Sequence, residues 1–173
     1  ATVMAWRSGD PGLVFIDEIS RHNPVPKNGI TCTNPCGEQP LSANESCTLG
    51  SINLSRMVEK GKVQWEKLRR IVRLAVRFLD DVIDANKYPT PEIEHATKAT
   101  RKIGIGVMGF ADALIMLGIQ YDSDKNIEFA EKLMKFINDE ARNASVELGM
   151  QRGSFPLFGE SVYAKKYKAM RNA

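Results

Sequence analysis

The spacing of apolar residues divides the chain into two parts. In residues 1–60 the apolar stretches are short, such as those at 13–16 and 49–54, and Gly, Pro, Asn and Ser separate them. This pattern is typical of loops and short extended segments. From Trp65 onward, apolar residues recur at steps of three and four, which is the period of a helix. We therefore expect a mostly α-helical segment with a loop and short-strand region in its N-terminal third.

Two long helices are clearly marked. The first is predicted from Trp65 to about Ala85. Its opposite-charge pairs at i, i+4 are Glu66 with Arg70 and Arg77 with Asp81. The second is predicted from a cap at Asp122 or Ser123 to Gly149, because its apolar residues alternate steps of three and four between a polar start and a glycine.

Three shorter helices are expected around these. The prolines of residues 88–91 interrupt the chain, and a short polar helix should follow over about 92–99. An apolar helix punctuated by glycines is predicted over roughly residues 107–117, ending at Gly118. Residues 161–170 are expected to form a final basic helix.

Composition bounds the class of protein. The chain has 173 residues with 43% apolar side chains, enough for a globular core, and 24 Lys and Arg against 21 Asp and Glu give a formal charge of +3. This balance does not indicate a nucleic-acid partner. We expect no membrane span and no signal peptide, and hence a cytoplasmic location. Because the chain starts with Ala and ends in a basic apolar pattern without Gly or Pro, we interpret it as a segment of a longer protein.

Three cysteines lie within sixteen residues of one another, at Cys32, Cys36 and Cys47. This clustering favours chemistry or metal binding over a secreted disulfide framework. Together with His22 they would supply four ligands of the kind that zinc takes. However, their C-x3-C-x10-C spacing lacks the paired C-x2-C of zinc sites, so a zinc-binding or non-catalytic helical interaction module is the alternative rather than the main interpretation.

The segment around Cys36 carries the strongest candidate chemistry. If the chain is extended there, Asn34, Cys36 and Glu38 point the same way, about 6.6 Å apart per step. The thiol could be a nucleophile, a metal ligand or a radical carrier, the carboxylate a general base, and the amide a donor to a substrate hydroxyl. The alternative is a turn-rich loop in which Asn34 and Glu38 only satisfy backbone groups.

Other motifs favour structural interpretations. Gly104, Gly106 and Gly109 form a literal G-x-G-x-x-G, but the residues before it are charged and helical, so we expect glycines that let the start of a helix pack closely. No Glu-x-x-His spacing accompanies the aspartates of the first long helix, so we expect a solvated face there. We expect solvent exposure of the following polar residues: Asp80, Asp81, Asp84, His95, Lys165, Lys166, Lys168 and Arg171. For the last four, which form a basic cluster, a phosphate contact is the alternative.

Residues 33–41 (TNPCGEQPL) and 45–54 (ESCTLGSINL) resemble the large catalytic chain of ribonucleotide reductases, in the form most like the adenosylcobalamin-dependent class II. The resemblance extends to 9–12, 77–80, 103–114 and 153–156, and so covers essentially the whole chain. It implies a fragment of a ten-stranded α/β barrel, with a strand and finger-loop region over 1–60 and a helical region over 61–173. The implied enzyme supplies deoxyribonucleotides for DNA replication.

The resemblance also implies residue roles. Cys36 would become a transient thiyl radical that takes the 3′ hydrogen of a ribonucleotide, Glu38 would be the base at the 3′-hydroxyl, and Asn34 would hydrogen-bond the ribose hydroxyls. Cys47 would be half of a redox-active pair whose other cysteine lies upstream of residue 1. A phosphate-binding loop would follow residue 173, so the isolated segment should not turn over. Cys32 stands where a small residue is expected and could compete for Cys47.

Cofactor and partners follow from the same resemblance. Adenosylcobalamin, bound mainly outside this segment, is the expected radical generator, a diiron partner subunit is the alternative, and a glycyl radical is least favoured. The implied partners are a ribonucleoside di- or triphosphate substrate, nucleotide effectors, a thioredoxin-like reductant and the rest of the same enzyme.

Overall fold

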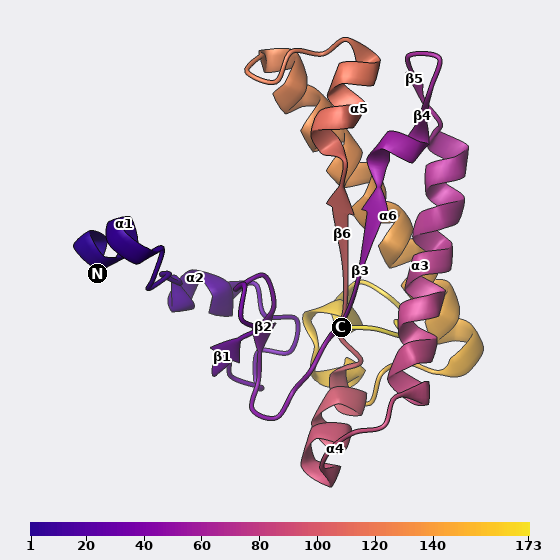
Figure 1. Ribbon diagram of the computed structural model, residues 1–173. Coiled ribbons are helices and arrows are strands. Elements are labelled where there is room, and N and C mark those ends of the chain that lie inside the picture. Colours follow the sequence, from indigo (N-terminus) through magenta and orange to yellow (C-terminus); the bar gives the residue numbers. More distant parts are fainter.

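The computed structural model describes all 173 residues, and it is mostly helical with short strands. Its centre is a pair of parallel strands, β3 (Thr48–Asn53) and β6 (Ile103–Met108), as Figure 1 shows. The chain crosses from one strand to the other through helices α3 (Trp65–Ala85) and α4 (Pro91–Thr100). A helical crossover of this kind is what a parallel pair requires. No helix is long and apolar enough to cross a membrane.

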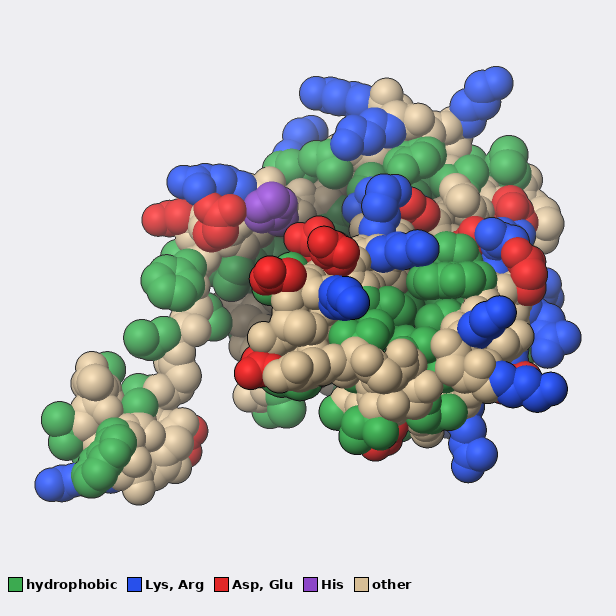
Figure 2. All heavy atoms as spheres, turned by 90° about the horizontal axis from the view of Figure 1, so that it is seen from above, with side chains coloured by type: hydrophobic (Ala, Val, Ile, Leu, Met, Phe, Trp, Pro, Cys, Tyr) green, Lys and Arg blue, Asp and Glu red, His purple; other side chains and the backbone are tan.

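The N-terminal third contains two short helices that the sequence analysis did not expect, α1 (Thr2–Ser8) and α2 (Ile16–Arg21). A left-handed Gly9 ends α1, whereas α2 has acidic residues in its first turn and Arg21 in its last, which favours a helix through its dipole. Figure 2 shows α1 standing apart from the body, with apolar side chains uncovered; Trp6 is 85% exposed. After α2 come β1 (Cys32–Thr33) and β2 (Pro40–Leu41), an antiparallel pair.

Strand β6 corrects the prediction of a helix over residues 107–117. Ile103, Ile105 and Val107 alternate with smaller residues, which is a strand period, and they pair in register with β3. Helix α5 (Phe110–Leu117) begins only after Gly109, which has φ 67°, and Gly118 ends it as expected. The glycines of the G-x-G-x-x-G therefore lie in a strand and at a helix cap, so our interpretation of them as a helix start was wrong for Gly104 and Gly106.

The two long helices pack together behind the strands. The bounds predicted for α3 are confirmed, and α4 lies one residue beyond its predicted range at each end. Glu66 pairs with Arg69 at 2.6 Å rather than with Arg70, whereas Arg77 and Asp81 pair at 3.4 Å as expected. The main core joins α3, β3, the 3-10 turn at Leu54–Met57 and helix α6 (Asp124–Arg152). Its most buried members include Ile52, Leu54, Leu68, Val72, Leu133 and Ile137.

The short hairpin β4 (Val58–Glu59) and β5 (Lys62–Val63) connects this core to α3. Helix α6 starts at its Ser123 cap but continues to Arg152, beyond the predicted end at Gly149. Gly149 is inside the helix because the chain near Met170 lies against it: an added Cβ would be 2.7 Å from the Met170 backbone nitrogen. The glycine thus marks a close approach and not a helix end.

The C-terminal residues do not form the predicted basic helix. They make two 3-10 turns, Phe158–Glu160 and Val162–Lys165, and then an irregular segment that returns to α6. A small cluster of buried Val25, Phe155 and Met170 holds this segment in place. Because the chain is irregular after Lys165, its basic side chains do not share one helical face.

The aspartates of α3 require a further correction, since one of them is not solvated. Asp80 is fully buried and binds Arg101, Arg152 and Arg171. It lies four residues after Val76 and three before Ile83, both fully buried, and so shares their face of the helix. Asp81 and Asp84 are about half exposed at the edge of this cluster. Of the residues expected in solvent, Lys165, Lys166, Lys168 and His95 are exposed, whereas Arg171 is not.

Candidate active site

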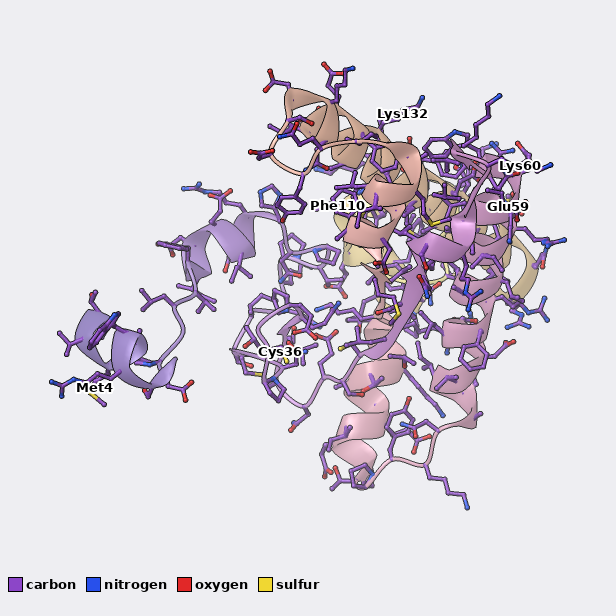
Figure 3. All side chains as sticks on the ribbon, turned by 45° about the horizontal axis from the view of Figure 1, so that its top comes forward. Met4, Cys36, Glu59, Lys60, Phe110 and Lys132 are labelled. Atoms are coloured by element: carbon purple, nitrogen blue, oxygen red, sulfur yellow. The ribbon has the colours of Figure 1, made fainter.

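Cys36 lies in the loop of the β1–β2 hairpin, as Figure 3 shows. The loop is closed by a turn in which the Gly37 backbone nitrogen donates to the Asn34 carbonyl at 3.0 Å. The sequence favours this turn, with Asn at its first position, Pro35 at its second and Gly at its fourth. Gly37 also has φ 85°, a backbone conformation that residues other than glycine rarely adopt.

The segment is therefore bent, and our premise of an extended chain from Asn34 to Glu38 was wrong. A proline and a glycine flanking Cys36 reverse the chain within four residues. Cys36 and Glu38 are nevertheless both exposed on the same loop, and Asn34 is half-buried at its base. The loop therefore leaves a thiol and a carboxylate accessible two residues apart.

Asn34 both shapes the loop and offers a donor. Its side-chain oxygen Oδ1 accepts from the Gln39 backbone nitrogen at 3.0 Å, and its own backbone nitrogen donates to the Gln39 carbonyl at 3.2 Å. For this oxygen, the alternative that Asn34 satisfies backbone groups of a turn-rich loop is thus correct. The amide nitrogen Nδ2 makes no hydrogen bond within the chain.

Cys47 lies immediately before β3 and is half-buried. Burial raises the pKa of its thiol, the negative charges of Glu38 and Glu45 raise this pKa further, and the ammonium of Lys102 opposes them. Cys47 is therefore a protonated thiol at neutral pH. The charge of Glu38 thus acts on Cys47 although the two residues lie in different segments, the hairpin loop and the segment just before β3.

Two buried charged residues that the sequence analysis missed lie beneath the hairpin. Lys102 donates from Nζ to Glu45 Oε2 at 2.7 Å and to the Pro40 carbonyl at 3.3 Å. Glu45 and Lys102 are 57 residues apart, so no local pattern relates them. The only hint in the sequence is that Glu45 lies two residues before Cys47, which was already a candidate site residue.

The structure does not assemble the zinc ligands considered above. All three cysteines are free, Cys32 is exposed on β1, and His22 lies at the end of α2 beside Glu18, 3.1 Å away. No three His, Cys, Asp or Glu side chains come together in a way that could hold a metal ion.

Comparison with known proteins supports the resemblance. Residues 1–173 match the family model of the ribonucleotide reductase barrel domain. The chain is 56% identical, over 98% of its length, to the "Vitamin B12-dependent ribonucleoside-diphosphate reductase" of Thermoplasma acidophilum, covering 22% of that protein. It is 54% identical, over 93% of its length, to the protein of the same name from Mycobacterium tuberculosis, covering 23% of that protein.

A more distant relative is the "Ribonucleoside-diphosphate reductase subunit alpha" of Chlamydia pneumoniae, 37% identical over 95% of this chain and 16% of that protein. The chain thus spans about a fifth of the length of the B12-dependent relatives that it matches. The greater identity to those proteins confirms the resemblance to class II, and the match over all 173 residues establishes that the chain belongs to the ribonucleotide reductase barrel domain family.

Proposed function

We propose that this chain is part of the catalytic chain of an adenosylcobalamin-dependent reductase acting on ribonucleoside diphosphates, and that the β1–β2 hairpin carries its radical cysteine. The observation that carries the proposal is the hairpin loop itself, which exposes Cys36 and Glu38 with Asn34 at its base. In this proposal β3 and β6 are strands of a ten-stranded α/β barrel, residues 1–60 are its finger-loop region, and residues 61–173 are its helical region. The parallel pairing of β3 and β6 through a helical crossover supports their place in such a barrel.

Cys36 starts and ends the reaction. As a thiyl radical, its sulfur takes the hydrogen atom from C3′ of the ribose and becomes a thiol, which leaves the radical on the substrate. After reduction of the substrate the same thiol returns the hydrogen atom. A tight turn suits this role, because the fixed φ of Pro35 and the hydrogen bond from Gly37 to the Asn34 carbonyl restrain the backbone on either side of the sulfur.

Glu38 and Asn34 act on the ribose hydroxyls. The Glu38 carboxylate accepts the proton of the 3′-hydroxyl as the 2′-hydroxyl leaves as water. The free Nδ2 of Asn34 donates to a ribose hydroxyl and orients the sugar above Cys36. Exposure of the Glu38 carboxylate supports its role as a base that a substrate can reach.

Cys47 supplies one of the two thiols that reduce the substrate. These two thiols give up two hydrogen atoms and form a disulfide, one hydrogen replacing the 2′-hydroxyl on carbon and the other leaving in water. The second thiol lies outside this chain. The raised pKa of Cys47 supports the role, because the protonated thiol is the form that holds the hydrogen. A thioredoxin-like reductant then restores the pair.

The residues of this chain do not by themselves fit adenosylcobalamin. Cys36 lines none of the main cavities, and the largest, about 550 Å³, lies between α6 and β6. When bound by the rest of the enzyme, the cofactor supplies the oxidising radical for the Cys36 thiol. Nucleotide effectors also bind elsewhere in this proposal, and the complete enzyme is cytoplasmic.

The test uses the full-length enzyme and labelled cytidine diphosphate, with and without adenosylcobalamin. We expect cobalamin-dependent deoxynucleotide from the wild type and none from Cys36→Ser, with nucleotide binding retained. Cys47→Ser should lose multiple turnover with a reductant that acts through the disulfide. Cys32→Ala is the matched control, since it removes an exposed thiol of the same hairpin and should leave product formation intact. Deoxynucleotide above background in Cys36→Ser would refute the proposal.

A further inference from the structure

The base of the hairpin rests on a buried ammonium group. The Lys102 side chain is 9% exposed, and its Nζ donates to the carbonyl of Pro40, the first residue of β2, and to the carboxylate of Glu45. Pro40 closes the hairpin that holds Cys36, and Glu45 is two residues before Cys47. A single side chain thus joins the two segments that carry the two thiols.

Glu45 is held as firmly as Lys102. Its side chain is 1% exposed, and Oε2 accepts from the Ser42 backbone nitrogen at 2.8 Å as well as from Lys102. The other oxygen, Oε1, accepts from the hydroxyl of Thr100 at the end of α4. A buried carboxylate with partners on both oxygens has little freedom to shift, so its position relative to Lys102 is fixed.

The residues on either side of Lys102 are also anchored. Arg101 adopts a left-handed backbone conformation, with φ 51°, and its guanidinium binds buried Asp80 at 2.8 Å. Gly104 leaves room for the Gln39 side chain of the hairpin loop, since an added Cβ at Gly104 would lie 2.5 Å from Gln39 Nε2. The start of β6 therefore forms a seat for the hairpin, with its backbone fixed from the helical side.

We propose that Lys102, through Glu45 and the Pro40 carbonyl, is a positioning residue that fixes the Cys36 loop relative to Cys47. The inference rests on the function proposed above. Both thiols act on the same ribose in that reaction, one at C3′ and the other at C2′, so their relative position sets how well each step is aligned. A misplacement of about 1 Å can cost on the order of 100-fold in rate.

The kinetic test compares double variants in the full-length enzyme. Lys102→Met alone leaves a buried carboxylate without its counter-charge, so Glu45→Gln/Lys102→Met is the informative variant. Glu94→Gln/Lys98→Met is the matched control, because it makes the same substitutions in a half-exposed ion pair of α4. We expect kcat for cytidine diphosphate to fall roughly 10- to 100-fold in the first, with KM changed less than about threefold. The control should retain kcat within about twofold.

A second measurement separates positioning from general loosening. Alkylation of Cys47 by iodoacetamide is followed across pH in the full-length enzyme, with the Cys47 peptide quantified by mass spectrometry. Removal of a nearby positive charge in Lys102→Met should move the midpoint to higher pH, and removal of a negative charge in Glu45→Gln should move it to lower pH. Loosening would expose Cys47 and move both midpoints to lower pH, because burial is the largest cause of its raised pKa.

The outcomes distinguish the inference from the function on which it rests. A wild-type kcat in the folded Glu45→Gln/Lys102→Met variant, with Cys36→Ser inactive, would overturn the positioning role alone. A lower pH midpoint of Cys47 alkylation in Lys102→Met would also overturn the positioning role, because it would indicate general loosening around Cys47. Product formation by Cys36→Ser would overturn the proposed function, and with it the catalytic meaning of Lys102.

Discussion

Arg101 and Asp80 form a buried ion pair, with Arg101 Nη2 2.8 Å from Asp80 Oδ1, that joins the end of α4 to the last third of α3. Both side chains are almost inaccessible, at 5% and 0% exposed. Arg152 from the end of α6 and Arg171 from the C-terminal segment reach the other oxygen of the same carboxylate. One carboxylate therefore links four segments of the helical part of the chain.

Asp80→Asn should destabilise the full-length enzyme. The substitution keeps the shape of the side chain but leaves the buried Arg101 with only the half-exposed Asp84 as an anion. Loss of one partner from a buried ion pair typically costs about 3–5 kcal/mol. Thermal and denaturant unfolding measure the effect. Asp139→Asn is the control, because its partner Lys135 is exposed on α6 and the melting temperature should hardly change. An unaltered melting temperature in Asp80→Asn would show that the arginines find other partners.

Gly149→Ala should also destabilise, against the ordinary preference of helices. Alanine in a helix interior is favoured over glycine by about 1 kcal/mol. Here the new methyl group would lie 2.7–2.8 Å from backbone atoms of Met170, which cannot move aside as a flexible side chain would. The clash should outweigh the helix preference, with a net loss of about 1–3 kcal/mol in the free energy of unfolding.

Asn143→Ala is the matched control for Gly149→Ala, since Asn143 is exposed on the same helix. Asn143→Ala should raise the free energy of unfolding by about a few tenths of a kcal/mol. A gain in stability from Gly149→Ala would mean that the C-terminal segment does not pack against α6 in solution.

Glu38→Gln should make Cys47 react faster with iodoacetamide at a fixed pH. The thiolate is the reactive form, and the pKa of Cys47 is raised first by burial and then by Glu38 and Glu45, so its thiolate forms at higher pH than in a free cysteine. Removal of the Glu38 charge lowers this pKa and moves the pH midpoint of the reaction down. Glu59→Gln serves as the comparison, because Glu59 lies at the β4–β5 turn, well away from Cys36 in Figure 3. An equal rate of Cys47 alkylation in wild type and Glu38→Gln would show that the charge of Glu38 does not act on Cys47.

The helices were predictable where one face is buried. The apolar period of α3 is regular from Trp65 to Ala85 because the same face packs on the core throughout. That periodicity also contained the position of Asp80, between Val76 and Ile83, but a charged residue on an apolar face has no meaning until its partners are known. Arg101, Arg152 and Arg171 come from distant segments, so the sequence alone could not pair them.

The candidate site was predictable in its residues and not in its shape. Asn34, Cys36 and Glu38 could be singled out by their chemistry, and their roles remain predictions. The bend at Pro35 and Gly37 was readable from turn preferences, whereas the extended spacing we assumed was not compatible with it. Strand β6 was hidden because its glycines do not distinguish a strand from a helix start. Lys102 and Glu45 could not be found, since only the tertiary fold brings them together.

The left-handed backbone at Arg101 sets two adjacent side chains to opposite tasks, since Arg101 binds Asp80 in the helical layer and Lys102 binds Glu45 beneath the hairpin. Neither layer can relax without pulling on the same short piece of backbone. We therefore expect the hairpin loop and the helical core to unfold in one cooperative step on heating or in denaturant. Loss of activity and loss of helical structure should then follow the same transition.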